Sequence, residues 1–169
     1  IAADRKQGRI IKGYISGLLD TSPALTALRV GETADSITLR SGVRVEIVTA
    51  SHRVSRGYSY AAVICDEMAF WRSEDSADPD RDVLNAVRPG MATVSGSMLI
   101  VLSSVYARRG ETWRAYHHHF GQDDDPTVVS SVFPGPPRTT GRPPLPSAIS
   151  WCLRDLRNKI APEAKMKFH

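Results

Sequence analysis

Two adjacent carboxylates, Asp66 and Glu67, are the residues of this chain whose type and position most favour chemistry. They directly follow a run of small and apolar residues, 61–65 (AAVIC), which is typical of a strand buried on both faces of a parallel sheet. In open α/β sheets the ligand crevice lies outside the carboxyl ends of the strands. One acid at such a rim can hold Mg²⁺ while its neighbour orients or activates an attacking water. A buried strand followed by a polar turn is the structural alternative.

A second apolar run, 98–102 (MLIVL), is followed by Ser103 and Ser104. Two such runs separated by a helical segment are the pattern of a βαβ unit with a parallel sheet. Because the crossover places both strand ends at one edge, the two serines are expected within reach of Asp66 and Glu67.

The other elements must position this edge. Asp4 predicts the cap of a helix with one apolar stripe that packs into a core, and Ser22-Pro23 predicts its end. Asp78-Pro79 predicts the start of the helix between the two strands, and Pro89-Gly90 predicts its end. Residues 37–47 alternate around Ser41-Gly42 and predict a β-hairpin, which is followed by a polar loop over 49–60.

Bulk composition limits the class of protein. The 169 residues, 41% of them hydrophobic, suit one domain with a real core. The net charge of +4 is compatible with a nucleic-acid partner without requiring one. Cys65 and Cys152 are the only cysteines, and we interpret both as reduced thiols in the cytoplasm. No apolar run approaches the ~20 residues that cross a bilayer, so no membrane contact is expected.

The C-terminal region differs in character. Six of the 11 prolines fall between Pro134 and Pro146, which predicts an irregular tail. Within it, residues 147–160 carry a weak helical pattern that predicts a short amphipathic helix. We therefore expect residues 1–122 to form the folded domain and residues 123–169 the tail.

Residues 2–121 resemble the ATPase part of phage terminase large subunits, the motors that drive DNA into a capsid. Four segments carry the resemblance: AADRKQGRI, TASHRVSRGYSYAAVICDEMAFWRSEDSADPD, LNAVRPGMATVSGSMLIVLSS and YARRGETWRAYHHHFG. The block around Asp66 and Glu67 is the most specific in order and spacing. The resemblance implies a three-layer α/β fold with a mostly parallel sheet of the P-loop NTPase type, incomplete at its N-terminus, with a hairpin insertion.

The resemblance also implies roles for particular residues. Asp66 falls on the Mg²⁺-binding position, Glu67 on the catalytic carboxylate, and Ser103-Ser104 on the motif that senses the nucleotide. Arg56 resembles the arginine finger offered to a neighbouring subunit's γ-phosphate, with Arg53 second; a planar, permanently charged guanidinium suits that task. A solvated loop cation is the alternative for either arginine.

Several departures from the family accompany the resemblance. The chain contains no G-x-x-x-x-G-K-S/T motif, the loop that cradles phosphates, and in the family that loop lies upstream of Ile1. Val105 stands where the family commonly has Pro. No acidic cluster of the family's nuclease domain follows Asp125.

Three functions therefore remain open. The first is a fragment of a DNA-packaging ATPase, inactive alone, whose parent would use ATP and Mg²⁺ in the host cytoplasm. The implied partners are double-stranded DNA, portal protein, the terminase small subunit and further copies in a ring. The second is a non-catalytic DNA- or partner-binding module built on arginines: Arg72, Arg81, Arg88, Arg108, Arg109 and Arg114. The third is a two-metal nuclease site containing Asp66 and Glu67.

Overall fold

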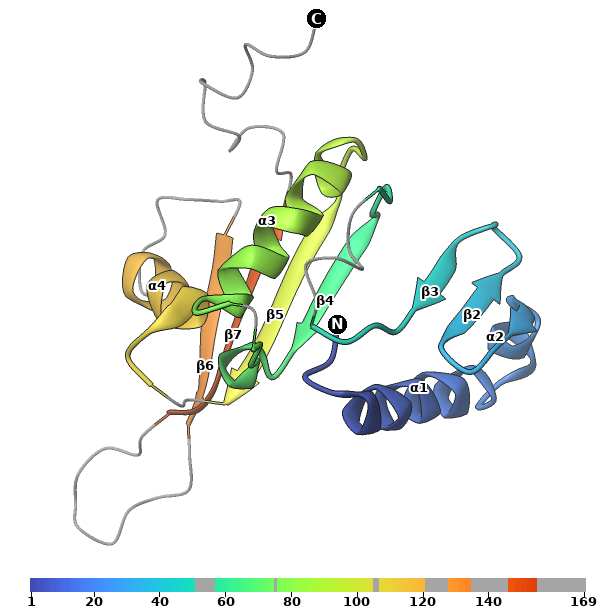
Figure 1. The fold of residues 1–169 in the computed structure, drawn as a ribbon. Helices are drawn as coiled ribbons and strands as arrows, with labels where there is room; N and C mark the ends of the chain where they lie inside the picture. Colours follow the sequence, from blue (N-terminus) through green and yellow to red (C-terminus); the bar gives the residue numbers. More distant parts are fainter. Residues whose placement is uncertain (51–56, 75, 105–106, 121–127, 135–145, 155–169) are drawn as a thin grey trace, which may run out of the picture. The chain divides into compact units, whose positions relative to one another are not determined.

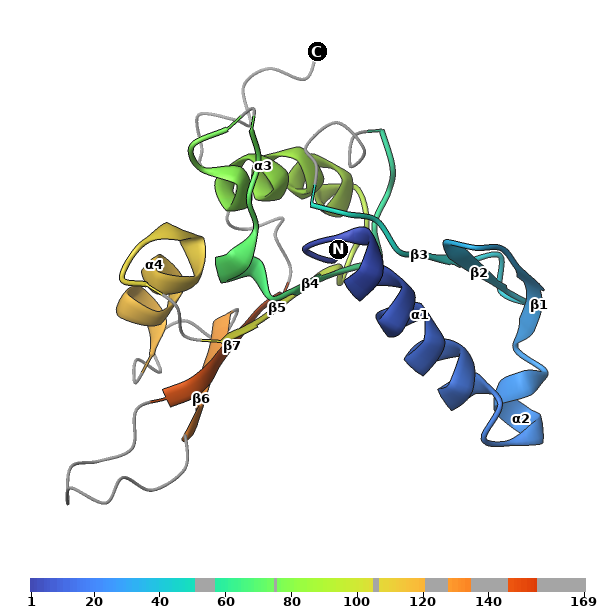
Figure 2. The same cartoon turned by 60° about the horizontal axis from the view of Figure 1, so that its bottom comes forward.

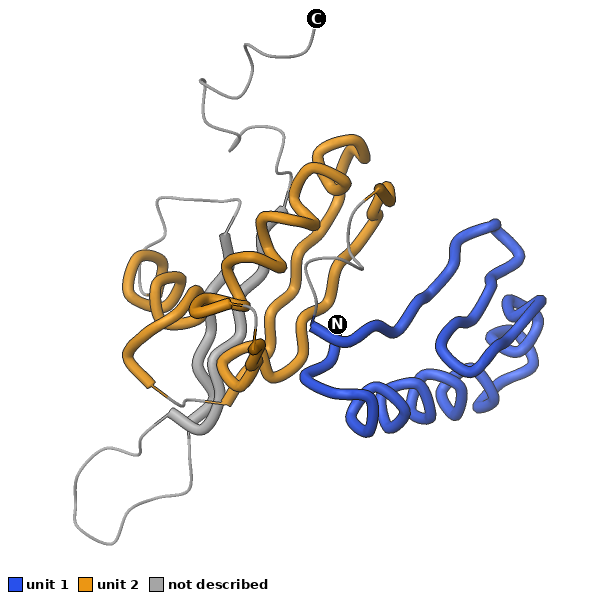
Figure 3. The backbone as a smooth tube through the Cα atoms, viewed as in Figure 1, with its two compact units in different colours: residues 1–50 blue, residues 51–169 orange. Residues whose placement is uncertain are grey.

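The computed structural model describes residues 1–50, 57–74, 76–104, 107–120, 128–134 and 146–154. The chain divides into two compact units, Ile1–Ala50 and Ser51–His169 (Figure 3). Each unit is described by itself below. The expected boundary after residue 122 stays a prediction. In the described residues, no helix is both long and apolar enough to span a membrane.

The first unit begins with helix α1 (Arg5–Leu19). Asp4 caps this helix as predicted, because its side chain accepts a hydrogen bond from the Gln7 amide at 2.8 Å. Ser22 and Pro23 follow the end of α1, but they start a further short helix, α2 (Pro23–Thr26), with Ser22 as its cap.

A three-stranded antiparallel sheet completes this unit, in the order β1 (Arg29–Glu32), β2 (Ser36–Leu39) and β3 (Arg44–Glu46). The predicted hairpin is confirmed as β2 and β3, and Gly42 in its turn has φ +84°. Strand β1 was not predicted. The chain start lies alongside the segment after β3, where Ala2 donates to the Val48 carbonyl at 2.9 Å.

The apolar stripe of α1 was predicted to pack into a core, and the structure buries it only in part. Three side chains of the stripe are half-buried: Ile11, Ile15 and Leu19. The other three are exposed: Ile10 at 43%, Tyr14 at 76% and Leu18 at 63%. Ile37 and Ala2 are the fully buried apolar side chains of this unit.

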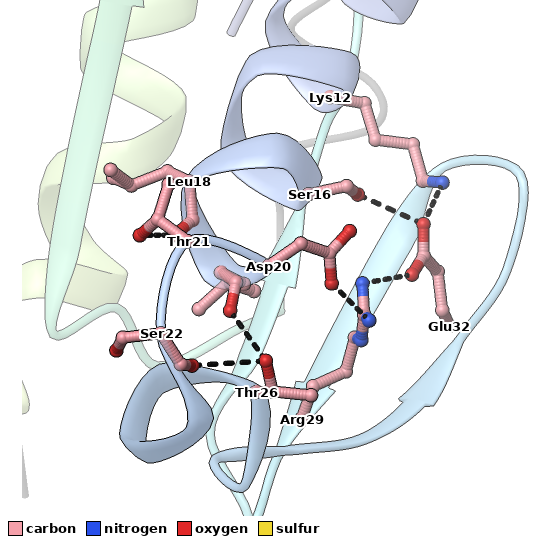
Figure 4. Close-up of polar contacts among 10 residues, drawn as sticks. Lys12, Ser16, Leu18, Asp20, Thr21, Ser22, Thr26, Arg29 and Glu32 are labelled. Atoms are coloured by element: carbon pink, nitrogen blue, oxygen red, sulfur yellow. Dashed lines mark hydrogen bonds and ion pairs between the residues drawn. The ribbon is translucent and has the colours of Figure 1, made fainter.

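Polar contacts centred on Glu32 join α1 to β1 (Figure 4). One carboxylate oxygen of Glu32 accepts from Lys12 Nζ at 2.5 Å and Ser16 Oγ at 2.9 Å, and the other accepts from Arg29 at 3.0 Å. These donors lower the pKa of Glu32, with the Lys12 hydrogen bond the largest cause. Arg29 also pairs with Asp20 at 2.6 Å.

The second unit is built on a four-stranded sheet in the order β4-β5-β7-β6 (Figure 1). Its strands are β4 (Ala62–Asp66), β5 (Met98–Ser104), β6 (Val128–Pro134) and β7 (Pro146–Arg154). β4 and β5 are parallel, which confirms the predicted pair. β7 is antiparallel to both β5 and β6, so the sheet is mixed rather than mostly parallel.

Helices α3 (Pro79–Ala92) and α4 (Gly110–His119) lie on the same face of this sheet (Figure 2). The buried apolar side chains of α3 are Val83, Leu84, Val87 and Met91. The buried apolar side chains of β4 and β5 are Val63, Cys65, Leu99 and Val101. These residues form the core of the unit.

The opposite face of the sheet is open at β4 and β5. Ile64 is 51% exposed and Leu102 is 42% exposed. The expectation of a strand buried on both faces is therefore wrong for β4. Among the described residues of this unit, helices cover one side of the sheet, so the fold is shown only as mixed α/β and the three-layer form is not seen.

Two further expectations about segments are corrected. Helix α3 continues through Pro89 and Gly90 to Ala92. The Tyr60 amide donates to the Gly90 carbonyl at 3.1 Å, and a Cβ at Gly90 would collide with the Tyr58 carbonyl. The last turn is thus held by tertiary contacts that override the local breaker.

Residues 146–154 form strand β7, not the start of the short helix predicted over 147–160. Ile149, Trp151 and Leu153 recur at every second position, which is the period of a strand. The segment thus fits both a helical and a strand pattern. Hydrogen-bonded pairing with β5 on one edge and β6 on the other favours the strand.

Candidate functional site

The carboxyl ends of β4 and β5 bring the predicted residues together. Asp66, the last residue of β4, is in register with Leu102 in the parallel pair, so Ser103 and Ser104 at the end of β5 lie at the same edge of the sheet. The Ser104 amide donates to Glu67 Oε2 at 3.0 Å, and the Ser104 hydroxyl donates to Glu67 Oε1 at 3.0 Å. The predicted proximity is confirmed for this pair, although the roles assigned to both residues stay predictions.

Glu67 has an unusual backbone. Its φ of 50° and ψ of 43° lie in the left-handed region, and it is the only such non-glycine among the described residues. This conformation costs a side-chain-bearing residue on the order of 1–3 kcal/mol. Strained backbone concentrates at functional sites, and here it belongs to the predicted catalytic carboxylate.

A turn tethered at several points follows Glu67. It contains the short helix η1 (Met68–Phe70), and Met68 is buried. The Ala69 amide donates to Ser103 Oγ at 3.0 Å, so Ser103 faces the turn while Ser104 holds the carboxylate. The Trp71 indole donates to the Asp66 carbonyl at 3.0 Å. Both strands thus contribute to fixing one loop.

Asp66 is half-buried at the end of β4. The described residues contain no group of three or more His, Cys, Asp and Glu side chains placed to hold a metal ion. Mg²⁺ is commonly bound by one or two carboxylates with water and substrate phosphates completing its octahedron. Two adjacent carboxylates are fewer than the ligands that such an ion takes, so a metal held by Asp66 would need water or substrate phosphates as well.

Arg56 and Arg53, the candidate arginine fingers, lie outside the described residues. The described loop resumes at Gly57, which has φ +88°. From there it packs against α3: besides the contacts at Gly90, Thr93 Oγ1 donates to Ser59 Oγ at 3.1 Å.

The arginines proposed for a basic face have different surroundings. Arg81 and Arg114 both pair with Glu111, at 3.2 and 2.6 Å. Arg108 lies 5.8 Å from the centre of the Trp113 ring, a cation–π contact. Arg72, Arg108 and Arg109 are exposed. Arg88 makes a long hydrogen bond of 3.5 Å to Asn85.

Sequence reasoning missed two residues that shape this unit. Trp71 appeared only as one letter of the family-like block, although a tryptophan is a large apolar side chain whose N–H usually finds a hydrogen-bond partner when it is buried. Asp80 lies in the first turn of α3, where an acidic residue is favourable without any further role. Its carboxylate instead accepts from the Glu111 amide at 2.6 Å and caps α4.

Cys65 lies beneath the candidate site on the covered face of β4 and is fully buried. Burial raises the pKa of its thiol to about 12. Since the thiolate is the nucleophilic form, this cysteine is chemically inert at neutral pH in the folded unit.

No protein-family model matches this chain, and searches of curated proteins and of solved structures also find no relative of it. The functional argument therefore rests on the residues and their geometry.

Proposed function

We propose that this chain carries the water-activating and Mg²⁺-binding edge of a nucleoside triphosphatase of the terminase large-subunit kind. One observation carries the proposal: the Glu67 carboxylate, at the end of β4, is bonded through both oxygens to Ser104, at the end of the adjacent parallel strand. Open α/β sheets bind their ligands outside the carboxyl ends of the strands, and an ATPase needs a residue at its ligand that positions the attacking water.

Each residue has a distinct role in this proposal. Asp66 would hold Mg²⁺, and Glu67 would orient the water that attacks the γ-phosphate. The ion, when bound, would neutralise the developing charge on the phosphate oxygens. Ser103 fixes the turn through the Ala69 amide, and Ser104 fixes the carboxylate. Arg56 would act on the γ-phosphate of a neighbouring subunit.

This chain contains no phosphate-cradling G-x-x-x-x-G-K-S/T motif. We therefore propose that it hydrolyses no ATP alone and contributes to a motor only together with such a loop. Double-stranded DNA, portal protein, the terminase small subunit and other copies of the motor are the partners that this proposal implies, in a host cytoplasm.

The first experiment tests the cation site directly. Mn²⁺, a paramagnetic substitute for Mg²⁺, is titrated into the ¹⁵N-labelled chain, and the broadening of each amide signal is measured. We expect selective broadening at Asp66, Glu67 and Ser104, lost in Asp66→Asn and kept in the matched variant Asp78→Asn, which changes an exposed aspartate. Uniform broadening, or broadening unchanged by Asp66→Asn, would contradict the proposal.

The second experiment concerns turnover. In a protein that joins this chain to a phosphate-binding loop, Glu67→Gln should reduce ATP turnover by at least a hundredfold while nucleotide binding persists, because the glutamate acts on water. Equal loss of binding and turnover would contradict that role.

A second candidate function has its own observation. Arg108 and Arg109 are exposed at the start of α4, Arg108 lies over the Trp113 ring, and no ion pair to a described residue is seen for either arginine. Such a pair suits contact with a nucleic-acid phosphate backbone. Binding of a duplex should then weaken with salt, and the double change Arg108→Ala and Arg109→Ala should flatten the salt slope by about two. A slope unchanged by these substitutions counts against it.

A further inference from the structure

The backbone of Glu67 requires an explanation that its own side chain does not supply. A glutamate at φ 50° is strained, and the bonds to Ser104 act on the carboxylate, several rotatable bonds away. Rotation about the N–Cα bond, which φ measures, is set by the peptide plane that precedes Glu67. Rotation about the Cα–C bond, which ψ measures, is set by the plane that follows.

Both planes are held by hydrogen bonds to their carbonyl oxygens. The carbonyl of the preceding plane belongs to Asp66 and accepts from the Trp71 indole at 3.0 Å. The carbonyl of the following plane belongs to Glu67 and accepts from the Phe70 amide at 2.9 Å. The second bond is ordinary turn geometry, which any sequence can supply. The first depends on one side chain.

Trp71 is well placed to act as a fixed support. It is 5% exposed, so its ring is held by packing and its N–H requires a partner inside the protein. Its own amide bonds to the Met68 carbonyl at 3.2 Å, and Met68 is 1% exposed. The indole is thus locked at both its backbone and its ring.

We propose that Trp71 is a positioning residue: its indole N–H holds the Asp66–Glu67 peptide plane in the orientation that turns the Glu67 carboxylate toward Ser104. The catalytic meaning of this role rests on the proposed function, in which the carboxylate acts on a Mg²⁺-bound nucleotide. That the indole N–H fixes the peptide plane and the direction of the carboxylate does not depend on the proposed function. With the plane released, Glu67 relaxes to negative φ, its Cα–Cβ bond points elsewhere, and the contacts to Ser104 are lost.

The test compares Trp71→Phe, which keeps an aromatic ring without the N–H, with Trp113→Phe on α4 as the matched control. In the ¹⁵N spectrum of the full chain, Trp71→Phe should shift the Glu67 and Ser104 amide signals and weaken Mn²⁺ binding at least tenfold. Trp113→Phe should leave both within twofold. A merely structural role would lower the unfolding midpoint without changing Mn²⁺ affinity at a temperature where the chain is folded.

A second measurement isolates the backbone. Glycine adopts positive φ freely. In a Glu67→Gly chain the backbone at position 67 is therefore unstrained, and there is no carboxylate for the Trp71 hydrogen bond to orient. Trp71→Phe should then lower the urea midpoint by less than half of its effect in the natural chain. Equal losses in the two backgrounds, or unchanged Glu67 and Ser104 signals in Trp71→Phe, would overturn the proposal.

The two measurements separate the possible failures. If the natural chain shows no selective Mn²⁺ broadening, the proposed function fails while the urea comparison still decides the role of Trp71. If Trp71→Phe does not fold, the same measurements are made with 3-benzothienylalanine at position 71, which keeps the bicyclic shape and lacks the N–H.

Discussion

Ser104 binds both carboxylate oxygens of Glu67, one through its amide and one through its hydroxyl, each at 3.0 Å. The two residues are 37 positions apart and belong to the ends of neighbouring parallel strands. This contact is the most specific link between the apolar runs of the sequence and a site at the edge of the sheet.

The contribution of this link is measurable. Ser104→Ala should lower the free energy of unfolding by about 1.5–3 kcal/mol, the usual range for a hydrogen bond to a charged group. In a Glu67→Gln background the same change should cost less, because the charge is gone. Urea denaturation of the four chains gives the coupling. Ser95→Ala, at an exposed serine, is the control, and additive effects of the two substitutions would contradict the link.

Asp80 should stabilise α4 from a neighbouring helix. Its carboxylate accepts from the Glu111 amide at 2.6 Å and from the Arg81 amide at 2.9 Å, while Arg109 at the N-cap of α4 offers no side-chain cap. Asp80→Ala should therefore lower the free energy of unfolding by about 1–2 kcal/mol, as loss of a cap does. Asp78→Ala is the matched control, because Asp78 occupies the N-cap of α3 without a side-chain bond.

Gly110 gives an independent test of the same contact. It has φ +80°, and a Cβ there would lie 2.6 Å from Asp80 Oδ2. Gly110→Ala should destabilise the chain in thermal denaturation, and should do so less when residue 80 is already Ala. A destabilisation of equal size in both backgrounds would show that backbone strain alone is responsible.

Acid should loosen the first unit through Glu32. Its pKa is lowered in the folded chain by Lys12 and Ser16, so the unfolded chain binds its proton more tightly. The stabilisation is present above the ordinary value of 4.5 and is lost as pH falls below it. Glu32→Gln should flatten the decline of thermal stability between neutral and acid pH. Glu46→Gln, at an exposed position of β3, should leave that decline unchanged.

Cys65 should make the second unit sensitive to alkali. Its folded pKa of about 12 lies above the ordinary value of 9.0, so the unfolded chain loses this proton first. Stability should fall as pH rises from about 9 toward 12, by at most about 1.4 kcal/mol per pH unit from this group. Urea denaturation of Cys65→Ala should show a weaker decline. In a Cys152→Ala chain, where Cys65 is the remaining thiol, Cys65 should not react with a thiol reagent at pH 7 until the chain is unfolded.

Local patterns were sufficient for strands β4 and β5 and for the start of α1. The apolar runs predicted β4 and β5 because a continuous apolar stretch bounded by polar residues has few other stable arrangements. Asp4 predicted a helix start because its side chain satisfies an amide inside the same turn. In each case the pattern that predicts the element lies within a few residues along the chain.

Other features depended on contacts between distant segments. Local propensity favoured ending α3 at Pro89, but the loop at Tyr58 and Tyr60 supports its last turn. The residues of β7 were predicted to begin a helix, but they pair with neighbouring strands on both edges and form a strand. Exposure of Ile64 on one face of β4 likewise depends on which helices cover the sheet, which no local pattern contains.

The sequence by itself determined that two acids follow one apolar run and that two serines follow the next. Only the tertiary structure decided that Ser104, rather than both serines, binds Glu67, and that Trp71 holds the peptide plane between the acids. The physical reason is that residue type and spacing set which groups end each strand, whereas register, backbone torsion and packing set where those groups point.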